Sequence, residues 1–158
     1  MLNIDWNTGS HTTKSFEEVV EIAKTYISNG AKIFIGSDSF KTNKKIIFAS
    51  AICLHGKENP SRYFFIRENV DKNHFNNLAS RITEEARRSI EIAEYLLSFE
   101  KINTHNIEIH LDVSPMHLNN GTSKFSDMLK GYVTGYGIQC KIKPNAWASQ
   151  AVADRHSK

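Results

Sequence analysis

The segment 31–39, AKIFIGSDS, decides the fold, because an apolar run ends there in a glycine, a serine and an acid. Ile33-Phe34-Ile35 has the β-branched and aromatic composition of a strand. Two further strand-like runs follow, over residues 45–54 and 62–67, and only short polar segments separate the three runs. Short connections favour antiparallel pairing. The three runs therefore predict a meander, with Asp38 near the end of its first strand.

Helices and strands alternate after the meander. The expected elements are, in order, a long helix at 76–99, a strand at 107–111, a helix at 123–136, a strand at 138–142 and a last helix at 146–155. Strands that are separated by helices pair in parallel through crossover connections. The sequence therefore predicts an α/β protein with a mixed five-stranded sheet, in the order βββαβαβα, covered by helices on both faces.

Two of these helices carry a stripe of apolar or small residues that is expected to face the sheet. In the long helix the stripe consists of Leu78, Ile82, Ala86, Ser89, Ile90, Ala93, Leu96 and Leu97. In the helix at 123–136 it consists of Phe125, Met128, Leu129, Tyr132 and Val133.

A further helix precedes the meander. Ser15 and Glu18 form a capping box before a helical pattern that runs to Ile27, and Asn29-Gly30 supplies its end. The chain shows no internal repeat and no linker-like segment. We therefore expect a single domain over residues 1–158, with residues 1–30 as an N-terminal helical extension of a core at 31–158.

Composition excludes several classes of protein but does not indicate a function. The 158 residues are 40% hydrophobic and 23% charged, with a net charge of +3, which is typical of a globular protein that tolerates a polyanionic partner. No apolar run approaches the roughly 20 residues that span a bilayer, and residues 1–6 do not resemble a secretory signal, so a cytoplasmic location is expected. Cys53 and Cys140 are expected to be buried reduced thiols, and no C-x-x-C pair suggests a zinc or redox site.

The order βββαβαβα, with an acid on the first strand, resembles the ribonuclease H-like superfamily from about Ala31 onwards. More narrowly, the chain resembles the YkuK-type branch, whose members are described as related to ribonuclease H. The pieces that carry the narrower resemblance are IGSDS (35–39), RI (81–82) with Glu85 and Ser89, IHLD (109–112), IKP (142–144) and VADR (152–155). Phe40 departs from that branch, where a polar residue is expected.

The resemblance implies a set of four catalytic acids. Carried over position by position, they are Asp38 on the first strand, Glu85 on the first crossover helix, Asp112 after the fourth strand and Asp154 on the last helix. Glu84 competes with Glu85, which we prefer because it lies beside the apolar stripe of its helix.

These acids suit the metal chemistry that the resemblance implies. Hard divalent cations prefer oxygen ligands, and a pair of Mg²⁺ or Mn²⁺ ions about 4 Å apart can stabilise both the attacking and the leaving oxygen of a phosphodiester. Asp38 would bridge the two ions, Glu85 and Asp112 would complete one site, and Asp154 the other.

Each of these residues also has a purely structural interpretation. Asp38 fits a turn, Asp112 a loop acid, Glu85 a solvated helix position, and Asp154 a partner of nearby basic residues. His110 is more typical of a buried supporting residue than of a metal ligand.

Other charged residues are candidates for contact with substrate or with solvent only. Lys143 and His156 are candidate substrate-binding residues, each with a solvent-exposed role as its alternative. Lys44-Lys45 and Arg87-Arg88 are interpreted as solvated charges.

We therefore expect a metal-dependent nuclease that acts on RNA, RNA–DNA hybrid or structured DNA, with nucleic acid as its partner. The alternative is an inactive module of the same fold that binds nucleic acid or protein. A 3′–5′ exonuclease of the DEDD type is excluded, because it needs a second acid where Phe40 stands. A transposase-like enzyme ranks low, because it would carry a glutamate on the last helix, where this chain has Asp154, and further domains. An actin-like kinase is excluded at this length, because it would need two such domains.

Overall fold

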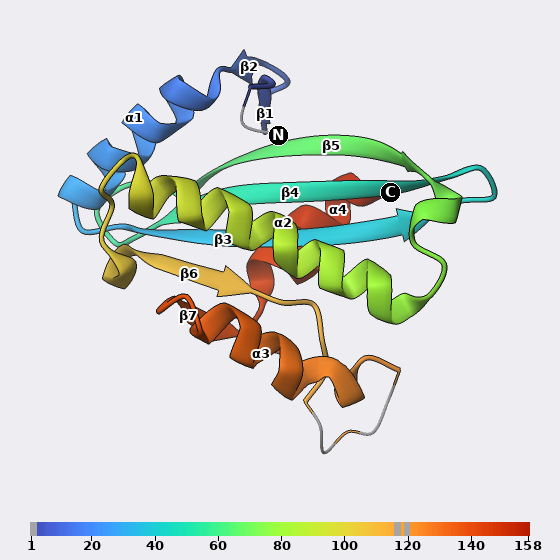
Figure 1. Cartoon of the computed structure of the whole chain (residues 1–158). Helices are drawn as coiled ribbons and strands as arrows, with labels where there is room; N and C mark the ends of the chain where they lie inside the picture. Colours follow the sequence, from blue (N-terminus) through green and yellow to red (C-terminus); the bar gives the residue numbers. More distant parts are fainter. Residues whose placement is uncertain (1–2, 116–117, 119–120) are drawn as a thin grey trace.

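The computed structural model describes residues 3–115, 118 and 121–158, and its centre is a seven-stranded sheet in the order β2-β1-β5-β4-β3-β6-β7 (Figure 1). The strands are β1 (Trp6–Thr8), β2 (Thr13–Lys14), β3 (Lys32–Lys41), β4 (Lys45–His55), β5 (Arg62–Asp71), β6 (Ile107–His110) and β7 (Gln139–Lys141). The helices are α1 (Phe16–Ser28), α2 (Leu78–Ser98), α3 (Ser126–Thr134) and α4 (Asp154–Ser157). Short helical turns are η1 (Lys72–His74), η2 (Thr104–Asn106), η4 (Ser123–Phe125) and the π-helical η5 (Ala148–Ala153).

The predicted meander is confirmed. β3 pairs with β4 in antiparallel fashion from Lys32↔His55 to Lys41↔Ile46, and β4 pairs with β5 in the same way. β6 then lies parallel to β3, and β7 lies parallel to β6, as the alternation of helices and strands predicted. The sheet is therefore mixed.

The predicted number of five strands is wrong, because residues before α1 add two more. β1 pairs with β5 through Asn7↔Phe65, and β2 pairs with β1. These strands have three and two residues, too few to show an alternating pattern, and β1 is anchored by the fully buried Trp6. The N-terminal extension is thus partly strand. Its predicted helix is confirmed, with the Ser15–Glu18 capping box at the start of α1.

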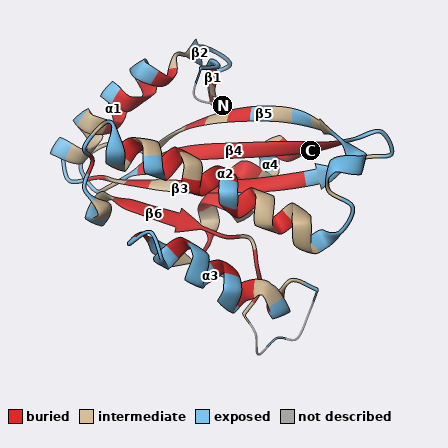
Figure 2. Cartoon of the chain, in the orientation of Figure 1, coloured by how far each residue is buried: buried red, intermediate tan, exposed pale blue. Residues whose placement is uncertain are grey.

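Helices cover both faces of the sheet (Figures 1 and 2). On one face, α1, α2 and α3 bury Phe16, Ile90 and Leu129 against a core shared with the central strands. On the other face, η5 packs on β3 and β4, and Ala148 and Ala153 join a smaller cluster with Ala51 and Cys53. Burial is most continuous along β4, where Ile46 to Leu54 are all buried.

Gly36 allows η5 to lie directly on the sheet. A Cβ atom at this position would stand 2.5 Å from the Ser149 backbone nitrogen and 2.6 Å from the Ala148 carbonyl carbon. Only glycine lets the two backbones approach so closely without displacement. The close approach fixes η5, and with it α4, above the second half of β3.

The predicted apolar stripes are correct at most positions. In α2, Leu78 is 40% exposed because it begins the helix, whereas Ile92, outside the predicted stripe, is fully buried. In α3, Met128 and Tyr132 are exposed, and Leu129 and Val133 make the contact with the core.

Cys53 is buried, Cys140 is partly buried, and both are free thiols. Burial raises the pKa of the Cys53 thiol to about 12. In the part of the chain that the structure describes, no helix has both the length and the apolar character needed to span a bilayer.

Candidate functional site

Strand register brings Asp38, in the second half of β3, together with Asp112 and Lys143, which follow the carboxyl ends of β6 and β7. Gly36 of β3 pairs with His110 of β6, so two residues further along each strand Asp38 faces Asp112. The Lys143 backbone nitrogen donates to the Val113 carbonyl at 3.0 Å, which places Lys143 beside Asp112. Because β6 ends at His110 while β3 continues to Lys41, the acids lie where the paired strands separate. Carboxyl ends of strands are the usual position of sites in open α/β sheets.

Asp38 is 7% exposed, and its surroundings oppose ionisation. Burial, followed by the charges of Asp112 and Asp154, raises its pKa to about 7. The Ser157 hydroxyl donates to Asp38 Oδ2 at 2.8 Å and acts in the opposite direction. A carboxyl group with a pKa in this range can gain or lose a proton near neutral pH.

Glu85 reaches the same region from α2. It is 7% exposed, and burial, followed by the charges of Asp38 and Asp112, raises its pKa to about 8. The Ser39 hydroxyl donates to Glu85 Oε1, and the charge of Arg81, one helical turn earlier, partly offsets the rise. Neighbouring side chains of a strand point to opposite faces of the sheet, so Ser39 faces α2 and contacts Glu85, while Asp38 faces α4 and contacts Ser157.

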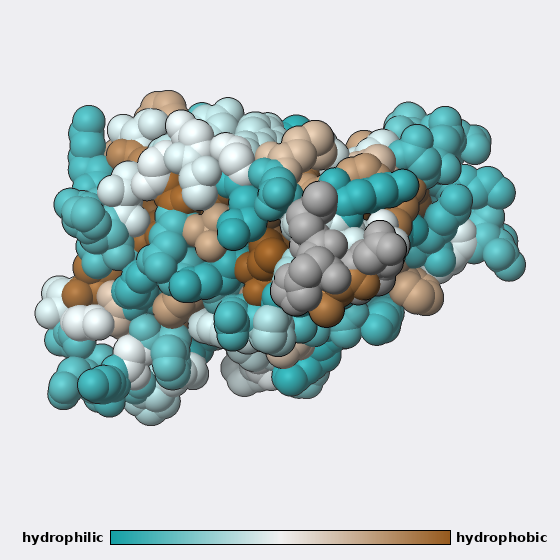
Figure 3. Space-filling model, turned by 90° about the horizontal axis from the view of Figure 1, so that it is seen from below, coloured by the Kyte–Doolittle hydropathy of each residue, from teal (hydrophilic) through white to brown (hydrophobic). Residues whose placement is uncertain are grey.

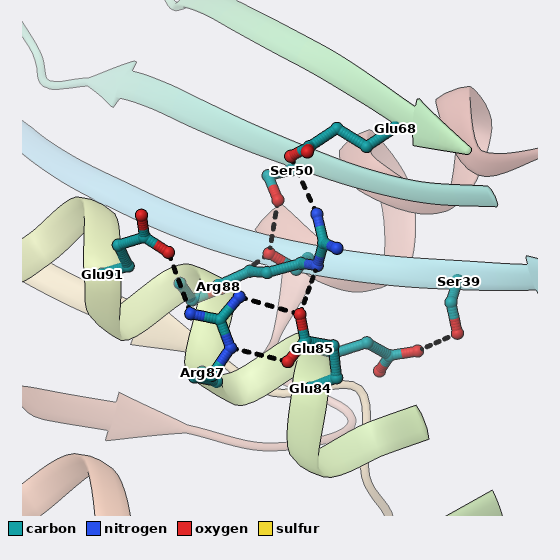
Figure 4. A network of polar contacts seen from close by, with 10 residues as sticks. Ser39, Ser50, Glu68, Glu84, Glu85, Arg87, Arg88 and Glu91 are labelled. Carbon is teal, nitrogen blue, oxygen red and sulfur yellow. Dashed lines mark hydrogen bonds and ion pairs between the residues drawn. The ribbon is translucent and has the colours of Figure 1, made fainter. Parts of the chain in front are cut away.

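Glu84 points away from Glu85 into a separate ionic network (Figure 4). Arg87 Nε donates to Glu84 Oε1 at 2.6 Å, and Arg88 Nε donates to Oε2 at 2.8 Å. Burial raises the pKa of Glu84, but the hydrogen bond from Arg87 and the charges of both arginines outweigh it, so the pKa is lowered. With both oxygens occupied, Glu84 is the weaker of the two candidates.

The interpretation of Arg88 as a solvated charge is wrong. Its side chain is only 8% exposed, it pairs with Glu68 at 2.8 Å as well as with Glu84, and it lies 4.4 Å from the centre of the Phe48 ring. Arg87, at 48% exposed, fits the expectation better.

Asp154 begins α4 and approaches the site from the opposite face to α2. Its side chain is 37% exposed, and Lys158 Nζ lies 3.0 Å from its Oδ1. Asp154 influences Asp38 through its charge. The position of Asp154 depends on η5, which packs against Gly36.

The four acids offer the oxygen donors that Mg²⁺ and Mn²⁺ prefer. Asp112 Oδ1 is buried, and the partner that the structure gives it is the Lys143 ammonium, whose Nζ lies 3.0 Å away. Within residues 3–115, 118 and 121–158, no group of three or more His, Cys, Asp or Glu side chains is arranged to hold a metal ion. The fit is therefore one of donor chemistry and proximity, not of a closed coordination shell.

The two candidate substrate-binding residues have different surroundings. Lys143 is 36% exposed at the edge of the acids, where its ammonium pairs with Asp112. His156 stacks on Phe65, with ring centres 3.6 Å apart, and its Nε2 lies 3.2 Å from the Tyr63 hydroxyl. Lys143 is thus at the acids, whereas His156 lies over β5.

His110 has the buried supporting position that the sequence favoured. Its Nδ1 accepts a hydrogen bond from the Ala148 backbone nitrogen at 3.0 Å, so the proton of the neutral ring is on Nε2, 2.9 Å from Glu108 Oε1. Burial lowers the pKa of His110. The side chain joins β6 to η5.

Sequence reasoning missed Ser157, Ser39 and Arg81 as neighbours of the acids. Ser39 follows Asp38 directly, so strand alternation could have identified it as a residue that faces the predicted helix. Arg81 precedes Glu85 by one helical turn. No local pattern marks Ser157, because its contact with Asp38 spans 119 residues of sequence.

Comparisons with known proteins agree with this architecture. The chain is 22% identical over 166 residues to the "Uncharacterized protein YkuK" of Bacillus subtilis (strain 168), a match that covers 94% of each chain. A family model described as Ribonuclease H-like matches residues 14–158, from β2 through α4. With nearly the whole chain matched and Asp38 of β3 beside Asp112 after β6, this protein belongs to the Ribonuclease H-like family.

Proposed function

We propose that this protein is a divalent-metal-dependent nuclease that hydrolyses phosphodiester bonds of RNA, RNA–DNA hybrid or structured DNA. The observation that carries the proposal is the mutual influence of acids from separate elements. Burial, followed by the charges of Asp112 and Asp154, raises the pKa of Asp38, and burial, followed by the charges of Asp38 and Asp112, raises that of Glu85. Clustered carboxyl groups with shifted pKa values are typical of functional sites. The Ribonuclease H-like family, to which the chain belongs, includes nucleases.

Each side chain has a part in this proposal. Asp38 would contact both ions, Glu85 and Asp112 one of them, and Asp154 the other. The bound ions would stabilise negative charge on the attacking and leaving oxygens. Asp38 and Glu85 must lose their protons to become ligands, which favours activity above neutral pH.

Lys143 and His156 are the proposed substrate contacts. The Lys143 ammonium pairs with Asp112 and can turn to a phosphate oxygen once cations neutralise that acid. His156, which stacks on Phe65 and lies near the Tyr63 hydroxyl, would contact the nucleic-acid strand at a point further from the acids.

An inactive module that binds nucleic acid or protein is the second candidate. It is favoured by the open arrangement of the acids, since the described residues form no ready group of three or more ligands. On this alternative the acids would serve only to hold α2 and α4 on β3 through Ser39 and Ser157.

A cleavage assay separates the two candidates. Wild type, Asp38→Asn and a control, Asp127→Asn, would be incubated with single-stranded RNA, RNA–DNA hybrid, duplex DNA and a DNA junction, in Mn²⁺, Mg²⁺ or EDTA. Asp127 is an exposed acid in the first turn of α3. We expect cleavage that requires metal, persists in Asp127→Asn, and falls on the order of a hundred-fold or more in Asp38→Asn. No cleavage of any substrate, or equal cleavage by Asp38→Asn, rejects the nuclease proposal.

A further inference from the structure

An exposed aromatic ring lies next to the acids. Phe40 is 41% exposed and follows Asp38 by two residues on β3, so both side chains are on the face that α4 covers. The two positions are about 7 Å apart along the strand. Across the ladder Phe40 pairs with Ile47, which is only 6% exposed. Phe40 thus forms a small apolar platform beside the proposed site.

Two arginines lie on the same face. Asp38 pairs with Ala49, and Ala49 with Arg67, so Arg67 is in the lateral row of Asp38, about 10 Å away. Arg155 follows Asp154 in α4. Burial and then the charges of Arg155 and Arg67 lower the pKa of His156, so both guanidinium groups lie near that ring.

The cations near this platform are available for an anionic ligand. Arg67 and Arg155 are exposed, and within the described ranges neither forms an ion pair. Lys41, Lys44 and Lys45 are exposed at the adjoining β3–β4 hairpin. The right-hand end of Figure 3, where Figure 1 places this hairpin, is accordingly hydrophilic. Asp71 stands opposite Lys45 in the ladder, but within the described ranges none of these five cations forms an ion pair, and unpaired positive charges favour a polyanion.

We propose that an unpaired nucleic-acid strand binds to the surface formed by Phe40, Ile47, Arg67 and Arg155, here called the Phe40 shelf. The Phe40 ring stacks on a base next to the phosphodiester that lies at the acids. The inference rests on the proposed function, since it takes nucleic acid as the ligand and specifies that it is single-stranded where it crosses β3. An aromatic ring flanked by cations is the common design for unpaired strands, because each free base offers a face for stacking. In a duplex the base faces are already stacked, so an exposed ring on a sheet would have no comparable partner.

The first experiment measures binding without cleavage. Fluorescence anisotropy in EDTA would compare a labelled 12-nucleotide single strand with the same strand in a duplex. Wild type should bind the single strand more tightly. Phe40→Ala should weaken single-strand binding about five-fold or more, and Phe40→Trp should restore it, because stacking requires an aromatic ring.

Phe99→Ala is the matched control, because Phe99 is 72% exposed at the far end of α2. It should bind as wild type does. Melting temperatures would establish that each variant is folded. Equal affinity of Phe40→Ala and wild type, equal affinity for single strand and duplex, or absence of nucleic-acid binding would each overturn the inference.

The charges of the shelf are tested through salt dependence. Arg67→Gln should reduce the magnitude of the slope of log affinity against log salt concentration by about 1, the change expected when one phosphate contact is lost. Lys57→Gln, which removes an exposed charge from the loop between β4 and β5, should leave the slope unchanged. Equal slopes for the two variants would contradict a phosphate contact at Arg67.

The binding and cleavage results are separable. If Phe40→Ala binds more weakly but no metal-dependent cleavage is found, the shelf stands and the nuclease proposal fails. If cleavage requires Asp38 while Phe40→Ala binds single strands normally, the nuclease proposal stands and the shelf fails.

Discussion

Asp38 and Glu85 carry carboxyl groups whose pKa values are raised by burial and then by the charges of neighbouring acids. Their pKa values are raised to about 7 and about 8, respectively. In the unfolded chain both groups titrate near 4. Between about pH 4 and pH 8 the folded protein therefore holds more protons than the unfolded chain, and the contribution of these groups to stability falls as pH rises.

This predicts how Asp38→Asn changes stability in metal-free protein. Because the amide cannot ionise, the variant should gain stability relative to wild type as pH rises from 5 to 8, reaching roughly 1–3 kcal/mol. Urea unfolding in EDTA at several pH values would measure the difference. Since His110 and His156 titrate in both proteins, the comparison removes their contributions. Parallel curves for the two proteins would contradict the raised pKa of Asp38.

Arg88 and Arg87 are neighbours in sequence with different environments, which gives a second prediction at this scale. Arg88→Ala leaves Glu84 and Glu68 without a buried partner and should reduce the free energy of unfolding by roughly 3–5 kcal/mol. Arg87→Ala removes a half-exposed pair and should cost about 1 kcal/mol or less. Denaturant unfolding compares them, and similar losses would show that burial of Arg88 contributes little.

At the scale of elements, the seating of η5 on β3 decides where Asp154 and Ser157 lie. Gly36→Ala would place a Cβ atom against the backbone of Ala148 and Ser149. We expect the free energy of unfolding to fall by about 1–3 kcal/mol, and the fluorescence maximum of nearby Trp147 to shift as η5 is displaced. Gly131→Ala, which meets no atom within 4 Å, is the control and should be neutral or stabilising by about 0.5–1 kcal/mol. If Gly36→Ala and Gly131→Ala have the same free energy of unfolding, the close approach at Gly36 does not contribute to the stability of the fold.

Local patterns predicted most elements because each pattern has a local cause. The capping box set the start of α1, and the apolar periodicity placed α2 within about two residues of its observed limits. They failed for β1 and β2, which exist only because β5 offers a free edge. They also failed to show that the last helix begins as a π-helical turn, which packs on Gly36.

At the scale of the whole molecule, cation binding should stabilise the fold. Metal that binds only the folded state raises stability by about 2.7 kcal/mol at a hundred times its dissociation constant, or about 5–10 °C in melting temperature. We expect this shift with Mn²⁺ in wild type and in Asp127→Asn, and its loss in Asp112→Asn. It should increase from pH 6 to pH 8 as Asp38 and Glu85 lose protons. An equal shift in Asp112→Asn would place the metal elsewhere.

The sequence by itself determined the order of the central elements, the meander and its parallel additions, and the acids worth testing. These follow from local periodicity, capping and connection length, which act over a few residues. Only the tertiary structure decided that Glu85 faces Ser39 while Glu84 pairs with arginines, and that Ser157 reaches Asp38. Such contacts join residues dozens of positions apart, and their geometry depends on how the sheet and helices pack, which no local pattern encodes.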